Sequence, residues 1–222
     1  MKKMKCDLHI HSNYSHDSGA SVKDIVDTAI ERGIDCIAIT DHKEVKGALE
    51  AVEYAKGKSI LIIPGIEVKT KSGDVLGLNI KEKIENGLSV RETIKKIKAL
   101  GGIAVLPHAF SWMCGLKENV TELVGAIDGL EVLNASVFGD GNKKAFFFSQ
   151  KHDLPFTCGS DAHFTNFIGK TYLEIPGQNL SAEQVIEAIK NKSGKICGRK
   201  AKTLEKIIDH VKRNLCKIGI RC

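Results

Sequence analysis

The sequence predicts an α/β fold in which a mainly parallel sheet is covered by helices. Short apolar segments such as CIAI (36–39) have the composition of strands that are buried on both faces. Segments with apolar residues at helical spacing alternate with them, and glycines such as Gly33 and Gly57 separate the two kinds. Such alternation over 222 residues is typical of an open sheet or of a closed barrel, and periodicity alone does not separate these two.

The expected elements follow one another with few interruptions. The first strand contains DLHIH (7–11), and Ser21 is a suitable N-cap for a helix that ends at Gly33. Ser89 is the expected cap of a later helix. The other expected strands cover 35–40, 60–63, 75–80, 103–106, 129–133, 156–159, 171–175 and 195–198, and the other expected helices cover 44–56, 90–100, 119–126, 142–152, 182–191 and 202–215.

Composition favours one globular domain, 1–222. The chain is 42% hydrophobic and has no polar linker. It has no apolar run of membrane-spanning length and no signal-peptide pattern at its start, so we expect a cytoplasmic protein. Its seven cysteines are odd in number and lack a CxxC pair, which favours reduced thiols. The net charge of +6, concentrated in the basic segment 192–222, is compatible with anionic substrates such as phosphate esters or nucleic acid, or with a solvated helix face.

A pair of histidines in the first strand is the first candidate for metal binding. Because side chains alternate along a strand, His9 and His11 point to the same face, while Leu8 and Ile10 pack on the other. Asp7 shares the face of His9 and could orient its ring. A polar strand face explains the pair equally well, so its meaning depends on residues further along the chain.

Polar residues gather at the ends of the expected strands. Five of the eight histidines and several carboxylates lie at these ends or in the loops that follow. The C-terminal strand ends of such folds meet at one rim, which carries the functional site. The candidate residues at this rim are His9, His11, Asp17, Asp41, His42, Glu67, His108, Asn134, Asp161 and His163.

This mixture of side chains favours divalent metal ions. Neutral imidazoles and carboxylates suit zinc, manganese or iron, whereas calcium prefers oxygen ligands alone. A carboxylate such as Glu67 could bridge two ions and hold a metal-activated hydroxide as the nucleophile. Hydrolysis of phosphate esters is the natural use of such a centre.

Four motifs in this order resemble the polymerase and histidinol phosphatase (PHP) family of metallophosphoesterases. They are DLHIHSNYSHD (7–17), ITDH (39–42), PGIEV (64–68) with VLPH (105–108), and GSDAH (159–163). The motif-bearing part, 5–175, covers most of the chain, with segment 192–222 expected to pack on it. The resemblance implies a single domain with a distorted (β/α)7 TIM-like barrel and two or three divalent ions (Mn, Zn or Fe) at its C-terminal rim.

The resemblance also implies how the ligands are shared. His9, His11, Glu67 and Asp161 would hold one ion, and Glu67 would bridge to a second ion held by His108. Asp17, His42 and His163 would hold the remaining ion. Asp41 would act as a proton carrier or as an orienting residue. Asn134 is a further ligand candidate from its strand-end position.

The chain departs from the family pattern at two places that bear on the site. Asp74 in GDVLG stands where many members have a histidine, so it is either a metal ligand or an exposed turn residue. Lys43 follows the DH pair, where an acidic or small residue is common, and could contact a substrate phosphate. Trp112, Lys170 and Arg199 are further candidates for substrate contact, although each is also explained as an ordinary surface residue.

The hypothesis that follows is a metal-dependent phosphoesterase. It would hydrolyse a phosphomonoester or a terminal phosphodiester of a small metabolite or nucleotide. Two alternatives stay open: a nuclease that acts on oligonucleotide ends, and a non-catalytic, metal-stabilised accessory or binding domain. The expected partner is a phosphorylated small molecule or a short oligonucleotide, with no membrane, and the oligomeric state is not predicted.

Overall fold

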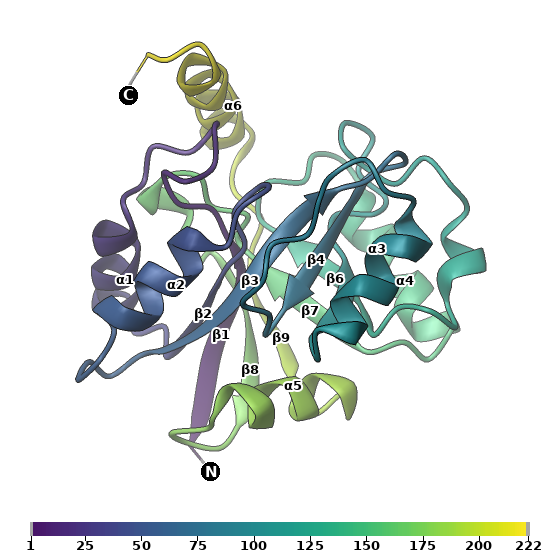
Figure 1. Cartoon of the computed structure of the whole chain (residues 1–222), viewed down its shortest axis with the longest axis horizontal. Coiled ribbons are helices and arrows are strands. Elements are labelled where there is room, and N and C mark those ends of the chain that lie inside the picture. Colours follow the sequence, from purple (N-terminus) through teal and green to yellow (C-terminus); the bar gives the residue numbers. More distant parts are fainter. Residues whose placement is uncertain (1, 221–222) are drawn as a thin grey trace.

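The computed structural model describes residues 2–220 (Figure 1). Met1, Arg221 and Cys222, which the expected domain 1–222 and segment 192–222 include, lie outside the described residues. The strands are β1 (Lys3–Ile10), β2 (Cys36–Ile39), β3 (Leu61–Lys69), β4 (Asp74–Leu78), β5 (Ile103–Leu106), β6 (Gly129–Asn134), β7 (Phe156–Gly159), β8 (Thr171–Pro176) and β9 (Lys195–Gly198). The α-helices are α1 (Val22–Glu31), α2 (Lys46–Tyr54), α3 (Val90–Ala99), α4 (Gly141–Lys151), α5 (Ala182–Lys190) and α6 (Thr203–Lys217), and the 3-10 helices are η1 (Val120–Leu123) and η2 (Thr165–Phe167).

All of these strands belong to one sheet with the order β7-β6-β5-β4-β3-β2-β1-β8-β9. The pairs β1/β2, β2/β3, β5/β6 and β6/β7 are parallel. Strand β4 lies antiparallel between β3 and β5, so β5 again runs in the direction of β3. Strands β1, β2, β3, β5, β6 and β7 therefore end at the same rim.

The sheet curls until its first parallel strand meets the end of β7. The Asp161 N–H donates to the His9 carbonyl, and the His11 N–H donates to the Ala162 carbonyl, both at 2.8 Å. A parallel bridge joins Ile10 to Ala162. The prediction of a distorted, TIM-like α/β barrel is confirmed, in a nearly closed form that includes the antiparallel strands β4, β8 and β9.

Alternation along β2 shows how this sheet is covered on both sides. Cys36 and Ala38 belong to one buried apolar cluster, whereas Ile37 and Ile39 belong to a second cluster that includes side chains of α1 and α2. Strand β2 therefore has four consecutive apolar residues, because both of its faces are buried. Among residues 2–220, no helix has the length and apolar composition to cross a membrane.

Two expected helices, 119–126 and 44–56, differ clearly from what the structure shows. The segment expected to form a helix at 119–126 contains only η1, capped by the side chain of Asn119. Its buried residues Val120 and Leu123 are three apart, which suits a single 3-10 turn. Helix α2 begins at Lys46 rather than at residue 44, and Val45 at its N-cap offers no side-chain acceptor. The caps expected at Ser21 and Ser89 are confirmed.

Candidate metal centre

The two histidines of β1 point into the same buried space. Their Nε2 atoms lie 3.1 Å apart, and both side chains are fully buried. On the other side of each ring, His9 Nδ1 contacts Glu131 at 3.0 Å and His11 Nδ1 contacts Ser15 Oγ at 3.3 Å. These outer contacts fix the ring orientation and leave both Nε2 atoms for the centre.

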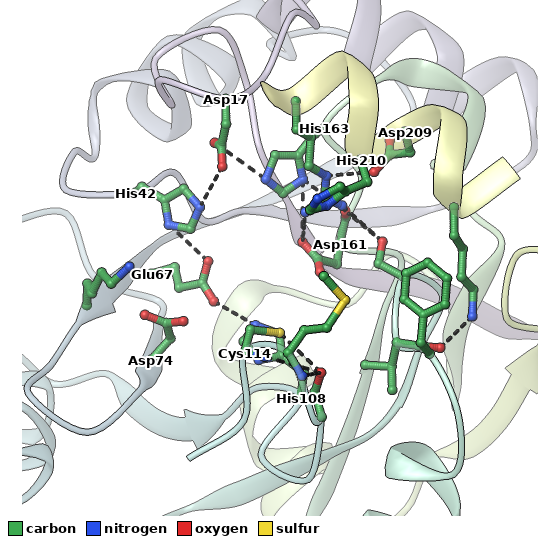
Figure 2. Close-up of a pocket in the computed structure, with 18 of the residues that line it drawn as sticks. Asp17, His42, Glu67, Asp74, His108, Cys114, Asp161, His163, Asp209 and His210 are labelled. Atoms are coloured by element: carbon green, nitrogen blue, oxygen red, sulfur yellow. Dashed lines mark hydrogen bonds and ion pairs between the residues drawn. The ribbon is translucent and has the colours of Figure 1, made fainter. Parts of the chain in front are cut away.

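Glu67 of β3 joins four histidines from three segments of the chain. Its carboxylate lies 3.6 Å from His9 Nε2 and 3.3 Å from His11 Nε2. It also lies 3.1 Å from His42 Nδ1 and 3.1 Å from His108 Nε2. The side chain is buried, and Figure 2 shows it between His42 and His108. One carboxylate at this position can serve two neighbouring ions.

The segment after β7 supplies the other side of the centre. Asp161 Oδ1 lies 3.5 Å from His11 Nε2 and 3.5 Å from His163 Nδ1. Asp17, in the loop after β1, lies 3.5 Å from His163 Nε2 and 3.7 Å from His42 Nε2. The eight side chains that the sequence placed first among the metal ligands therefore surround one space.

The backbone is strained where two of these residues leave their strands. Asp161 has a φ of 52° and His108 a φ of 32°, values in the left-handed region that non-glycine residues seldom adopt. Such conformations cost roughly 1–3 kcal/mol each and cluster at functional sites. At these two positions the strain turns a strand-end side chain toward the rim.

The donor set fits divalent metal ions. Three groups of side chains each bring their ligand atoms within 4.8 Å of one another: His11, His42 and His163; His9, His11 and Asp161; and His9, Glu67 and His108. Asp17 Oδ1 and His163 Nε2 are buried and have no hydrogen-bond partner in the described structure. Buried polar atoms normally have a hydrogen-bond partner or a metal ion, so a cation bound between these two atoms would supply the missing partner. The residues support a centre for more than one ion.

A cavity of about 300 Å³ opens over these groups (Figure 2). Six of the predicted ligands line it: Asp17, His42, Glu67, His108, Asp161 and His163. Helix α6 forms another part of its wall, through Lys206, Asp209, His210, Arg213 and Lys217. The cavity is thus bounded by the rim of the barrel and by the last helix of the chain.

The less certain ligand candidates take different positions. Asp74 lines the cavity next to Glu67, with an Oδ1 atom that has no partner, so it is not an exposed turn residue. Burial, followed by the charge of Glu67, raises its pKa to about 6. Asn134 donates through Nδ2 to Glu131 at 2.9 Å and to Asp161 at 3.4 Å. It therefore supports a ligand carboxylate from behind.

Asp41 holds the loop after β1 in place. It accepts hydrogen bonds from Ser12 N and Ser12 Oγ at 2.6 Å and from Ser15 Oγ at 2.8 Å. Ser15 in turn contacts His11 Nδ1. Asp41 is buried and does not line the cavity, so its geometry supports the orienting role better than the role of a proton carrier.

The expectation that Asp7 orients His9 is wrong. Asp7 accepts hydrogen bonds from the backbone N–H groups of Ser160 and Gly169, both at 2.8 Å, and so anchors the segment between β7 and β8. The residue at His9 Nδ1 is Glu131 instead.

The four substrate-contact candidates do not line this cavity. Lys170 donates to Glu205 at 2.8 Å, and Trp112 is 75% exposed, with its neighbours Ser111 and Met113 on the cavity wall instead. Arg199 is exposed next to β9. Lys43 lines a separate surface depression beside His42. Their roles as substrate contacts stay predictions without support from this geometry.

Sequence reasoning missed Glu131 and the residues of α6. Glu131 is a buried carboxylate in the apolar strand β6 and accepts from His9, from the His108 N–H and from Asn134. A single charge within the segment GLEVL was the available signal, because buried charges need partners. Arg213 of α6 donates to the Asp161 carbonyl at 2.9 Å and is paired with Asp209.

The charged groups of the centre shift one another's pKa values. Burial alone would lower the pKa of His9, but Glu131, Glu67 and Asp161 outweigh it and raise this pKa well above 6.5. Glu67 and Asp17 likewise outweigh burial at His42 and raise its pKa. Burial would raise the pKa of Glu67, yet the charges of His42 and His9 bring it well below its usual value. Burial, followed by the neighbouring His163 and His42, lowers the pKa of His11 well below 6.5. The cluster thus favours charged carboxylates facing protonated His9 and His42, with His11 neutral.

The stability of the metal-free protein should therefore fall as the pH rises above neutrality. The pKa values of His9 and His42 are raised in the folded state. Their contribution to the free energy of unfolding is therefore complete below the unfolded-state pKa of 6.5, and it is lost as the pH rises through the raised pKa values. Glu67 has a lowered pKa, so its contribution to stability is complete above the unfolded-state pKa of 4.5. We expect the melting temperature of chelator-treated protein to be highest between about pH 4.5 and 6.5.

Calorimetry with and without metal checks this expectation. Metal ions compete with protons for the same imidazoles, so the metal-loaded protein should gain stability over the same rise in pH. A melting temperature of the metal-free protein that increases from about pH 6.5 to pH 9 would contradict the assignment of the raised histidine pKa values.

Fold and side chains together define a class: an α/β barrel whose strand-end histidines and carboxylates form a candidate multi-metal centre. Residues 7–207 match the PHP domain, and the chain belongs to this family. It is 38% identical over 143 residues to the uncharacterized protein MJ1587 of Methanocaldococcus jannaschii, a match that covers 60% of this chain and 82% of that protein.

Two solved structures show the same fold. A two-domain protein from Bacteroides vulgatus, described as containing a predicted PHP-like metal-dependent phosphoesterase, has a TM-score of 0.76 and 18% identity, over 96% of this chain and 70% of that chain. The lesion-specific endonuclease PfuEndoQ from Pyrococcus furiosus has a TM-score of 0.66 and 17% identity, over 93% of this chain and 66% of that chain. At these identities the likeness concerns the fold alone.

Proposed function

We propose that this chain is a metal-dependent phosphoesterase that hydrolyses a phosphomonoester or a terminal phosphodiester of a small metabolite or nucleotide. The observation that carries the proposal is the position of Glu67, whose one carboxylate lies within 3.6 Å of His9, His11, His42 and His108. Membership of the PHP family supports it.

The ligands divide into two sides around Glu67. His9, His11, Glu67, His108 and Asp161 would hold ions on the side of β1, β5 and β7. Asp17, His42 and His163 would hold an ion near α6. We propose two or three manganese, zinc or iron ions, which when bound would supply a nucleophile at neutral pH and offset the charge that develops on the phosphoryl oxygens.

The chain's own side chains set the conditions at the centre. Glu131 and Ser15 hold the rings of His9 and His11 from behind, at 3.0 and 3.3 Å. Arg213 fixes the backbone after β7 through the Asp161 carbonyl. Lys217 lies 3.8 Å from Asp17 Oδ2 and, once Asp17 is committed to a metal, its charge is available to a substrate anion.

The cavity favours a small substrate over a nucleic-acid duplex. Its volume of about 300 Å³ lies at the lower end of small-molecule sites, and α6 bounds one side of it. The fold likeness to PfuEndoQ keeps the nuclease alternative worth testing. An accessory domain without activity would have no evident need for the carboxylate shared by four histidines.

Elemental analysis joined to a phosphate-release screen tests the proposal. We expect purified protein to carry more than about one equivalent of manganese, zinc or iron, and to release phosphate from p-nitrophenyl phosphate or from metabolite phosphates after metal is supplied. Dinucleotides in the same panel test the nuclease alternative, whose activity would fall steeply with added salt. Less than about one equivalent of metal, with no activity on the panel after manganese or zinc is added, would reject the phosphoesterase.

A further inference from the structure

The last helix places its polar face against the protein and its apolar face outside. Lys206 and Asp209 are buried, and Arg213 reaches Asp161. On the other side, Leu204 is 67% exposed and Val211 52% exposed. Surface helices normally bury their apolar stripe, so this arrangement leaves an apolar face that the described chain does not cover.

The outward residues of α6 follow the spacing of a helix–helix seam. Leu204, Ile208, Val211 and Ile218 are exposed, and Leu215 is half-buried. These five residues are separated by steps of four, three, four and three residues. This is the a/d pattern of a heptad repeat, and it continues into the residue that caps the helix. Lys206 and Arg213, seven residues apart, occupy the opposite position of the heptad and point into the protein. The seam therefore faces away from the barrel.

We propose that this seam, Leu204 to Ile218, binds the same seam of a second copy of the chain, with the two α6 helices antiparallel about a two-fold axis. In this arrangement Leu204 packs against Leu215 of the other copy, and Ile208 packs against its Val211. Two identical helices related by a two-fold axis present the same patch to each other, so one apolar stripe is sufficient. Figure 1 shows α6 at one end of the molecule, near the C-terminus.

Charge complementarity favours a second copy as the occupant. Glu205 and Lys212 both flank the seam on the same side. In the antiparallel pair, Glu205 of one copy lies between the same two apolar layers as Lys212 of the other, which gives two symmetric ion pairs. Within its own chain, Glu205 accepts from Lys170 and from the N–H of Lys202, the N-cap residue of α6. Lys212 lies 5.3 Å from the ring centre of Phe164.

A membrane surface fits this helix less well. Interfacial helices place lysines and arginines beside the lipid headgroups, flanking their apolar face. Here Lys206 and Arg213 point inward to Val137 and Asp161. Lys212, which flanks the seam, lies over the ring of Phe164. A dimer would also brace the wall of the metal centre, because the same helix that forms the seam carries Arg213.

Sedimentation velocity over about 1–100 μM protein tests the dimer, and it needs neither metal nor substrate. We expect the wild-type chain to sediment at twice its monomer mass of 24.2 kDa. Ile208→Asp should raise the dissociation constant of the dimer by on the order of 100-fold or more, since the substitution is present in both copies at the interface. Phe147→Asp is the matched control, because Phe147 is exposed to a similar degree on α4. It should leave the dimer intact.

A charge exchange tests the antiparallel orientation. Glu205→Lys alone should weaken the dimer by on the order of tenfold, and Lys212→Glu should do the same. The double variant should restore wild-type association. A wild-type monomer at 100 μM, a dimer that survives Ile208→Asp, or a double variant no better than the single ones would each overturn the proposal. A monomer that binds vesicles of phosphatidylserine and phosphatidylcholine would point to a membrane instead.

Discussion

Glu67→Gln is expected to reduce turnover by on the order of 10³-fold or more, because even the outer partners of metal ligands typically change metal affinity or activity by 10- to 100-fold. The substitution preserves shape and removes the charge. Glu67 is the carboxylate nearest to the rings of His42 and His108, at 3.1 Å from each. A neutral amide cannot bridge two cations with the strength of a carboxylate. The bound metal should therefore fall together with activity.

Metal content and kcat of the variant, measured on the same preparation, check this result. Glu174→Gln is the matched control, since Glu174 of β8 pairs with Lys3 on the surface and does not line the cavity. The circular dichroism spectrum should match that of the wild type, because the barrel is held by apolar clusters on both faces of the sheet. A variant that retains its metal and loses less than about tenfold in kcat would show that Glu67 is not the central ligand.

The position of the site could be predicted because its motifs are local. In DLHIH the alternation of a strand decides which side chains share a face, and the loops after parallel strands end at one rim. The structure accordingly brings His9, His11, Glu67 and Asp161 into one space. The barrel was predictable from the family resemblance rather than from periodicity, which fits an open sheet equally well.

The direction of exposed side chains could not be predicted. Lys170 and Trp112 lie close in sequence to ligand motifs, yet one is paired with Glu205 and the other faces solvent. The sequence predicted a helix at 202–215, but the usual burial of an apolar stripe would have turned Lys206 and Arg213 outward. Only tertiary contacts decide such orientations.

Glu131 was missed for a related reason, since a single carboxylate in an apolar strand does not reveal its partners. Its Oε1 atom contacts His9 Nδ1, and its Oε2 atom accepts hydrogen bonds from the His108 N–H and from Asn134 Nδ2. Because a carboxylate only accepts, a metal-bound and therefore neutral His9 would carry its proton on Nδ1 and turn the Nε2 lone pair toward the centre. Glu131 is thus a positioning residue for two candidate ligands on different strands.

Glu131→Gln should weaken metal binding by about 10- to 100-fold. The amide has one acceptor oxygen, so its NH₂ group must face the donor on His9 or the donors on His108 and Asn134, and one side of the network loses its acceptor. Titration calorimetry with zinc or manganese measures the affinity, and ¹⁵N NMR of the His9 ring reports the site of its proton. Glu122→Gln, on the exposed face of η1, is the control. An unchanged affinity together with an unchanged His9 tautomer would show that Glu131 serves only the fold, whereas a shifted tautomer with weaker binding identifies it as the residue that orients His9.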